Sequence, residues 1–351
     1  MTEKPKHLLD SVSESPKRPP EVPKTASEYI SADEEEQQQQ VSMSPNPGNG
    51  IQRYLVAIEY IGTRFSGSQH QPNCRTVVGA LKEAFRKFIG QPVSICCSSR
   101  TDAGVHAVSN VCHIDVQRIS KRKPGEVLPP HEPNVVRRAV NHFLQRNEGD
   151  IMVIDVRCVP ADFHARFKAQ ERTYFYRLLS GPEPLSIFEK DRAWHVPEEL
   201  DIPSMQAKSP IRTLDELNVT EVVSTPYFPS LIERRQENLT KADVCASSNK
   251  PENDLPLRSI EGASDYNGAT VLGFGARRRH RCFVITARAR SFLYHQVRLF
   301  VGVLKAVGTG GLAISDVERI LNAKTVTAAS PMAPACGLYL GRVKYDLPRE
   351  E

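Results

Sequence analysis

Residues 100–106 read Arg100-Thr101-Asp102-Ala103-Gly104-Val105-His106, and they separate two apolar segments of the chain. The preceding segment, 92–97, is typical of a strand, and the following segment, 109–116, alternates as a second strand does. The sequence therefore predicts a sharp turn that holds the carboxylate of Asp102 beside the guanidinium of Arg100, which makes Asp102 a candidate catalyst. On spacing alone, the alternative is that both residues only stabilise the turn. Asp102 would accept hydrogen bonds from nearby backbone amides, and Gly104 would adopt a positive φ.

Hydrophobic periodicity on either side of this turn predicts the elements of a mixed fold. Before and after it we expect a strand at 54–58, a helix at 76–88 capped by Thr76, a helix at 135–144 and a strand at 151–156. This order is that of a ferredoxin-like unit. Strands at 174–179, 217–223 and 282–289 and a helix at 292–307 predict a second unit of the same plan, so the predicted fold class is α+β.

Composition divides the 351 residues into a tail and a folded part. Residues 1–50 are rich in Pro, Ser, Glu and Gln and hold nine acidic against five basic residues, which predicts a disordered acidic tail. The net charge of +5 for the whole chain therefore becomes +9 for the remainder, and a basic surface suits a polyanion such as RNA. A long polar stretch at 224–275 predicts a flexible surface insertion.

Metal binding and membrane insertion both lack support in the sequence. The eight cysteines include no Cys-x-x-Cys pair, and the neighbours Cys112 and His113 point to opposite faces of a strand, so we expect no metal. No apolar stretch approaches the roughly 20 residues of a membrane span, and the start resembles neither a secretory signal nor a transit peptide. We expect a soluble intracellular protein, with mitochondrion, nucleus and cytoplasm left open.

The turn at 100–106 resembles the catalytic signature of the TruA-type family of tRNA pseudouridine synthases, in which an Arg-Thr-Asp-Ala-Gly-Val-His turn carries the essential aspartate. Further segments are similar to motifs of that family and occur in the same order: 54–62, 162–167, 172–176, 291–298 and 337–340. The nearest resemblance is to the eukaryotic pseudouridylate synthase-like branch. It implies two ferredoxin-like halves, 51–160 and 161–345, that share a mixed, mainly antiparallel sheet with a central catalytic cleft.

The resemblance also implies an isomerase that converts uridine to pseudouridine in RNA. Asp102 would be the catalytic residue, acting either as a nucleophile or as a base. Arg298 would pair with Asp102, and Arg100 would help to hold the flipped nucleotide. Tyr174 would stack on the target uracil, and Leu338 would form an apolar wall beside the base.

Partners and secondary contacts follow from the same resemblance. The substrate would be tRNA, with messenger RNA as an alternative. No cofactor would be required. Two copies of the chain would associate. His106 and His164 are not expected to be catalytic. Arg166 and Arg172 are candidate phosphate contacts, together with the basic loop at 121–123.

One departure from the family pattern keeps a second function open. Residues 206–211 stand where relatives carry a longer stretch, so we expect the second half to lack a helix that covers the sheet. A catalytically impaired RNA-binding protein of the same fold is therefore the alternative to an active synthase. A hydrolase is disfavoured, because no motif places a second carboxylate to activate water.

Overall fold

The computed structural model describes residues 50–123, 125–146, 148–206, 214–222, 280–323, 325 and 328–347. The predicted tail, apart from Gly50, lies outside these residues, as does the whole insertion predicted at 224–275. Of the shortened segment at 206–211, only Gln206 is described. The described residues therefore cover most of the two predicted halves.

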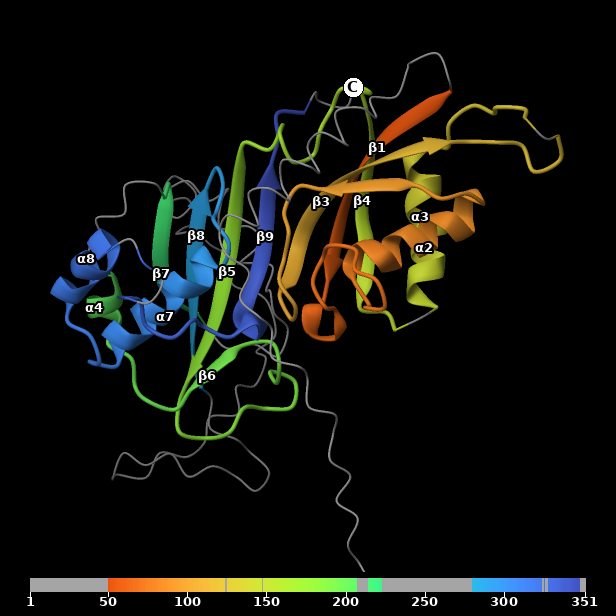
Figure 1. The fold of residues 1–351 in the computed structure, drawn as a ribbon. Coiled ribbons are helices and arrows are strands. Elements are labelled where there is room, and N and C mark those ends of the chain that lie inside the picture. The colour runs from red at the N-terminus through yellow and green to blue at the C-terminus, as the bar shows by residue number, and fades with distance from the viewer. Residues whose placement is uncertain are drawn as a thin grey trace, which may run out of the picture. The chain divides into compact units, whose positions relative to one another are not determined.

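The first half follows the predicted order of strands and helices (Figure 1). Its elements are β1 (Ile51–Tyr60), α2 (Val77–Ile89), β2 (Ser94–Cys97), β3 (His106–Gln117), α3 (Pro133–Gln145) and β4 (Ile151–Val159), with a short 3-10 helix η2 (Gly62–Arg64). The strands lie in the order β4, β1, β3, β2, and every pairing is antiparallel, which is a ferredoxin-like arrangement. Thr76 caps α2 as predicted, because its hydroxyl accepts a hydrogen bond from the Gly79 amide at 3.1 Å.

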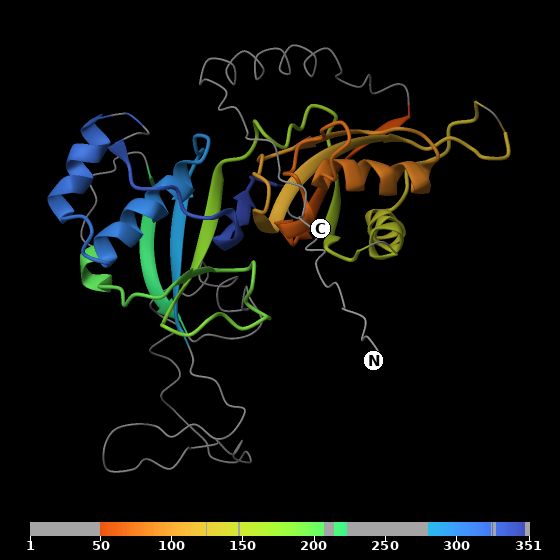
Figure 2. The same ribbon diagram turned by 60° about the horizontal axis from the view of Figure 1, so that its bottom comes forward.

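The second half repeats this arrangement with additional elements. It comprises β5 (Glu171–Ser180), β6 (Trp194–Val196), α4 (Ile202–Gln206), β7 (Glu216–Val222), β8 (Arg281–Ala289), α7 (Gln296–Gly308), α8 (Ile314–Ala323), η4 (Ala335–Gly337) and β9 (Leu338–Lys344). The order β9, β5, β8, β7 is again antiparallel throughout. Figure 2 shows α7 beside β7 and β8, and α2 and α3 beside the strands of the first half.

Several elements differ from the sequence predictions. Helix α7 begins at Gln296 and not at the predicted residue 292, because the backbone of His295 has a left-handed conformation with φ of 60°. Strand β2 begins at Ser94, two residues later than predicted. The hydrophobic pattern did not predict β6, α4, α8 or β9.

The two halves join through strands β3 and β9. These strands pair in parallel at His106 with Tyr339 and at Ala107 with Leu340. Strand β2 pairs with residues 112–115 of β3, so β9 continues the sheet beside the start of β3. The result is one mixed, mainly antiparallel sheet of nine strands, which confirms the predicted α+β class and the shared sheet. It also places the loop at 98–105, which carries Asp102, where the halves meet.

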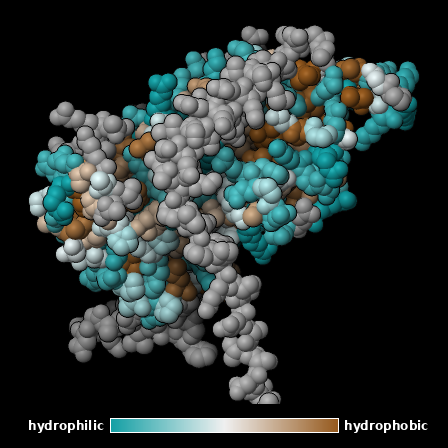
Figure 3. All heavy atoms as spheres, viewed as in Figure 1, coloured by the Kyte–Doolittle hydropathy of each residue, from teal (hydrophilic) through white to brown (hydrophobic). Residues whose placement is uncertain are grey.

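The hydrophobic core is continuous through both halves. Tyr174 and Tyr176 belong to it, whereas Phe175 packs into a separate cluster with Val108 and Val284, as the period of two predicts. Each large side chain that is fully buried contributes about 1.5–3 kcal/mol. The surface coloured in Figure 3 is mainly hydrophilic, with hydrophobic residues in separate small groups. None of the described helices is long and apolar enough to cross a membrane.

Candidate active site

The loop that carries Asp102 is anchored to the first half by the residue before it. The Thr101 hydroxyl is 2.8 Å from the hydroxyl of Tyr60. The Thr101 amide donates to the Ser68 hydroxyl at 2.8 Å, and the Ser68 amide donates back to the Thr101 carbonyl at 2.9 Å. Because Thr101 is buried, these bonds fix the backbone from which the Asp102 side chain projects.

Two glycines permit the path of this loop. Gly104 has a φ of 81°, as predicted for the turn, which a side chain would disfavour. Gly62 lies so close to the loop that an added Cβ would be only 1.9 Å from the Val105 carbonyl oxygen. The Gly62 amide also donates to Nδ1 of His106 at 3.0 Å. The turn is therefore packed directly against the end of β1.

The Asp102 carboxylate contacts the second half. Arg298 donates from Nη1 to Oδ2 of Asp102 at 3.0 Å, and Nε2 of His295 lies 3.2 Å from the same oxygen. Arg298 is itself held, because its Nε donates to the Ala333 carbonyl at 2.8 Å. These contacts cross the boundary between the halves, so Asp102 does not serve its own turn alone.

The surroundings of Asp102 keep it ionised. Burial raises the pKa of this carboxyl, but the contacts with His295 and Arg298 outweigh burial and hold the pKa below its usual value of 3.8. The side chain of Asp102 is 25% exposed. The site therefore presents an anion that solvent reaches, held by donors at the start of α7 in the second half.

The other predicted site residues differ in their exposure to solvent. Arg100 is exposed, and the side-chain oxygen of Gln69 accepts from its Nε at 2.9 Å once the Gln69 amide is oriented to satisfy both partners. Tyr174 is buried, and its ring meets Phe292 edge to face at 5.1 Å. Leu338 is buried as the first residue of β9 and pairs with Tyr176.

Electrostatics links Tyr174 to the site. Burial raises the pKa of Tyr174 to about 12, the charge of Arg172 acts against this, and the negative charge of Asp102 adds to it. A hydrogen bond with Ser99, in the Asp102 loop, also lowers the pKa. The phenol therefore stays neutral at physiological pH and lies within electrostatic range of Asp102.

Arg172, a candidate phosphate contact from sequence, has a different environment in the structure. Its Nη2 donates to the carbonyls of Ser98 at 3.1 Å and Arg166 at 3.0 Å, and its Nη1 donates to the Arg290 carbonyl at 2.6 Å. Its Nε donates to the Ser99 hydroxyl at 3.2 Å. Arg172 therefore ties the start of the Asp102 loop to β5 and to the end of β8.

His106 connects elements of both halves. Its Nδ1 accepts from the Gly62 amide, and its Nε2 lies 3.1 Å from the Asp191 carbonyl and 3.2 Å from that of Cys336. Its ring stacks on Tyr339 with centroids 4.5 Å apart. Burial lowers the pKa of His106 to about 4, so the ring is neutral at pH 7. These contacts make it a structural residue of the boundary.

The lowered pKa of His106 makes stability depend on pH. Between pH 6.5 and 4 the unfolded chain binds a proton that the folded chain does not, so the free energy of unfolding falls as the pH falls. From pH 7 to pH 5 we expect a loss of about 2 kcal/mol from this one residue. Asp102 titrates below this window and does not contribute.

Urea unfolding of the parent and of a variant at pH 7 and pH 5 measures the contribution of His106 to this loss of stability. In His106→Asn the Asn oxygen can still accept from Gly62, but the side chain no longer titrates. The loss of stability between the two pH values should shrink by about 2 kcal/mol in the variant. An equal loss in the parent and the variant would exclude His106 as its source.

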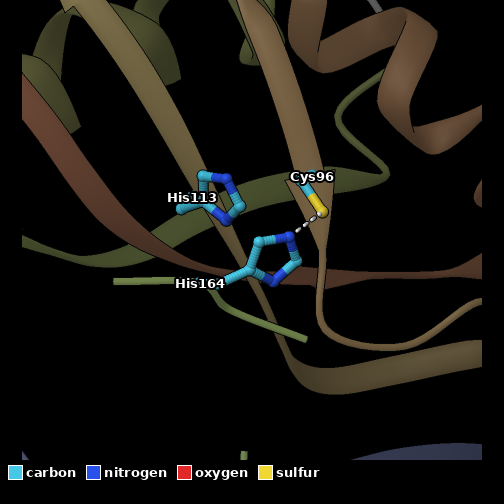
Figure 4. Close-up of side chains that lie close together, drawn as sticks. All are labelled: Cys96, His113 and His164. Carbon is cyan, nitrogen blue, oxygen red and sulfur yellow. Dashed lines mark hydrogen bonds between the residues drawn. The ribbon is translucent and has the colours of Figure 1, made fainter. Parts of the chain in front are cut away.

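Three residues that could bind a metal also come together. Figure 4 shows Cys96 of β2, His113 of β3 and His164 facing one another, with candidate ligand atoms within 4.8 Å. However, Nδ1 of His113 accepts from the Ala165 amide at 3.1 Å, and Nδ1 of His164 accepts from that of Arg166 at 3.2 Å. Each neutral ring therefore carries its proton on Nε2.

A metal-bound imidazole needs the opposite arrangement, with the second nitrogen donating its proton to an acceptor. The pKa of His113 is lowered to about 4, first by burial and then by the charge of Arg53, so cations are already disfavoured here. Instead, Nε2 of His164 lies 3.7 Å from Sγ of Cys96 and is placed to donate to it. This cluster does not fit a metal ion in the observed arrangement.

Comparison with known proteins agrees with this geometry. The family model described as tRNA pseudouridine synthase matches residues 56–168 and 202–346. The chain is 35% identical to tRNA pseudouridine synthase A of Rhodospirillum centenum, over 84% of this chain and 100% of that protein. It is 33% identical to tRNA pseudouridine synthase A of Xanthobacter autotrophicus, over 84% of this chain and 99% of that protein.

The sheet has nine strands in two ferredoxin-like units, and an ion-paired carboxylate lies where these units meet. Together with the matches, this arrangement defines the class of protein as an isomerase that acts on RNA. Both matched segments of the family model include site residues, since Asp102 lies in the first and Arg298 in the second. The chain belongs to the tRNA pseudouridine synthase family. Its place in the eukaryotic branch stays a prediction.

Sequence reasoning missed one residue of the site, His295. It lies in the same motif as Arg298, three positions earlier, and contacts the same oxygen of Asp102. The signal that was available is the helical spacing. If residues 292–307 formed the predicted helix, His295 and Arg298 would share a face.

Proposed function

We propose that this chain isomerises uridine to pseudouridine in tRNA and that Asp102 is its catalytic residue. The observation that carries the proposal is the ionised carboxylate of Asp102, held at 3.0 Å by Arg298 of the second half and accessible to solvent. The matches to tRNA pseudouridine synthases support the reaction and the substrate class.

The reaction breaks the bond between uracil N1 and the ribose, turns the base and reattaches it through C5. Oδ2 of Asp102 is engaged by Arg298 and His295, whereas Oδ1 accepts no hydrogen bond from any described residue. Oδ1 is therefore the oxygen available to attack the nucleoside or to take a sugar proton. Either role needs the ionised form, which the lowered pKa of Asp102 supplies.

Three further residues have proposed roles in holding the nucleotide. Arg100 is exposed, two positions before Asp102, and can contact the backbone of a flipped nucleotide. Tyr174 supplies a ring on which the uracil stacks, and Leu338 supplies apolar surface beside the base. Because Tyr174 and Leu338 are largely buried in the absence of RNA, the base would reach them only after leaving its helical stack.

Paired substitutions of Tyr174 test its role. Tyr174→Phe keeps the ring and loses the hydrogen bond with Ser99, so we expect a loss of kcat/KM below about tenfold. Tyr174→Leu removes the ring, and we expect a loss of roughly 5- to 150-fold, the value of one base–aromatic stack. Tritium release from labelled tRNA measures both. Equal losses in the two variants would show that stacking on the ring is not its role.

Release of tritium from tRNA labelled at uracil C5 tests the proposed function itself. Isomerisation replaces the C5 hydrogen, so an active enzyme releases tritium into water and Asp102→Asn does not. Tight tRNA binding without release would instead indicate the catalytically impaired RNA-binding protein. No binding and no release would reject both functions.

Two finer aspects of the proposal need separate tests. The same release assay with labelled messenger RNA would show whether the substrate range extends beyond tRNA. The resemblance to bacterial relatives further leads us to propose association of two copies, which light scattering of the full chain would detect as twice the mass of 39.2 kDa.

A further inference from the structure

His295 shares with Arg298 a single oxygen of Asp102. Nη1 of Arg298 is 3.0 Å and Nε2 of His295 is 3.2 Å from Oδ2. Both donors come from the start of α7, three residues apart. With two groups on Oδ2, rotation of the carboxylate about its Cβ–Cγ bond would break both contacts, whereas one donor alone would leave more freedom.

The backbone of His295 is held in an unfavourable conformation. Its φ of 60° and ψ of 0° are left-handed, which costs a non-glycine residue on the order of 1 kcal/mol. Hydrogen bonds on both sides maintain this turn: the Leu293 amide donates to Oε1 of Gln296 at 2.8 Å, and the Leu299 amide donates to the His295 carbonyl at 3.0 Å. Strain that the surroundings maintain in this way is concentrated at functional sites.

The side chain of His295 has no role in capping the helix. Although His295 occupies the position before α7, its imidazole makes no capping hydrogen bond to the first turn. The ring of Tyr294 instead stacks on it, with centroids 3.5 Å apart and planes inclined by 28°. The imidazole is therefore held in one plane, and its only described polar contact is with Asp102.

We propose that His295 is a positioning residue for Asp102: with Arg298 it fixes Oδ2, so that Oδ1 faces the nucleoside. This inference rests on the proposed function and adds a residue to its machinery. Arg298 supplies the permanent charge, and His295 supplies a second direction of contact, which defines the plane of the carboxylate. The orientation of a reacting group decides its rate, since a misplacement of 1 Å costs about 100-fold.

Two substitutions of similar size and flexibility separate this role from a structural one. His295→Gln retains an N–H donor near the place of Nε2, whereas His295→Met has none, and both side chains are unbranched and strain the backbone alike. We expect kcat for tritium release from tRNA to fall roughly 10- to 100-fold in the Met variant and less than about fivefold in the Gln variant. The KM for tRNA should change less than about threefold in both, because the lost contact is with Asp102.

The melting temperatures of the two variants serve as the control, and they should agree within about 2 °C. If kcat is unchanged in His295→Met, or falls as far in His295→Gln, His295 does not position the carboxylate, although wild-type release would still support the proposed function. A fall confined to KM would likewise contradict positioning. If the wild-type chain releases no tritium from tRNA that it binds, the proposed function fails, and the role of His295 fails with it.

Discussion

Asp102→Asn is expected to lower the rate of tritium release from tRNA by roughly 10⁴-fold or more, which is the scale seen when an essential nucleophile or base is removed. Asparagine has the same shape as aspartate, and its oxygen can still accept from Arg298. It has no negative charge, however, so it can neither attack the nucleoside nor take a sugar proton. The effect should appear in kcat, with tRNA affinity changed only a few-fold.

A matched control shows whether the effect is specific to Asp102 or follows from removing any carboxylate that pairs with an arginine. Asp155 of β4 also carries a carboxylate that pairs with an arginine, Arg157, at 3.3 Å, but its side chain is 58% exposed. Asp155→Asn should leave release within about twofold of the parent, because an exposed pair contributes little. If Asp102→Asn retained a tenth of the parent activity, the chemistry would have to be assigned to another group.

The sequence predicted the position of Asp102 well because that position depends on local features. A strand, a short turn with a glycine and a second strand are all visible in the order of the residues, and they correspond to β2 and β3, although β2 begins two residues later and β3 three residues earlier than predicted. The cap of α2 by Thr76 was predictable for the same reason. In each case residues within a few positions of one another determine the structure.

Features that depend on distant residues were not predictable from pattern alone. The parallel pairing of His106 with Tyr339 joins positions 233 residues apart, and no periodicity encodes it. The start of α7 was predicted too early because residues 292–295 fit an apolar helical pattern, whereas the structure places His295 in a left-handed turn. The contact between His295 and Asp102 follows from both features, which explains why only the structure revealed it.

Glu189→Met is expected to lower the free energy of unfolding by about 3–5 kcal/mol, the cost of leaving a buried charge without its partner. Glu189 accepts from Arg177 of β5 through both oxygens, at 2.5 and 3.0 Å, and the Arg177 side chain is 1% exposed. Burial alone would lower the pKa of Arg177, but the Glu189 carboxylate raises it above its usual value. Without Glu189, the buried guanidinium would stay charged and lose this partner.

The loss of stability should also affect the boundary between the halves, because the segment around Glu189 contacts residues of that boundary. The Asp191 carbonyl lies 3.1 Å from Nε2 of His106, and the Arg192 carbonyl accepts from the Tyr339 hydroxyl at 2.7 Å. His106 and Tyr339 form one of the two residue pairs that join β3 to β9. We therefore expect Glu189→Met to lower the melting temperature and also the rate of tritium release at temperatures below the transition.

Two comparisons by urea unfolding decide whether burial of the pair is the cause. Arg281 and Glu221 form an equally close double contact, at 2.9 and 2.8 Å, but their side chains are 50% and 47% exposed, so Glu221→Met should cost less than about 1 kcal/mol. Replacing both Arg177 and Glu189 with methionine removes the unpaired charge, and this double variant should regain most of the lost stability. If the double variant were less stable than Glu189→Met, Arg177 would stabilise the fold through contacts other than Glu189, and the unpaired charge would not explain the loss.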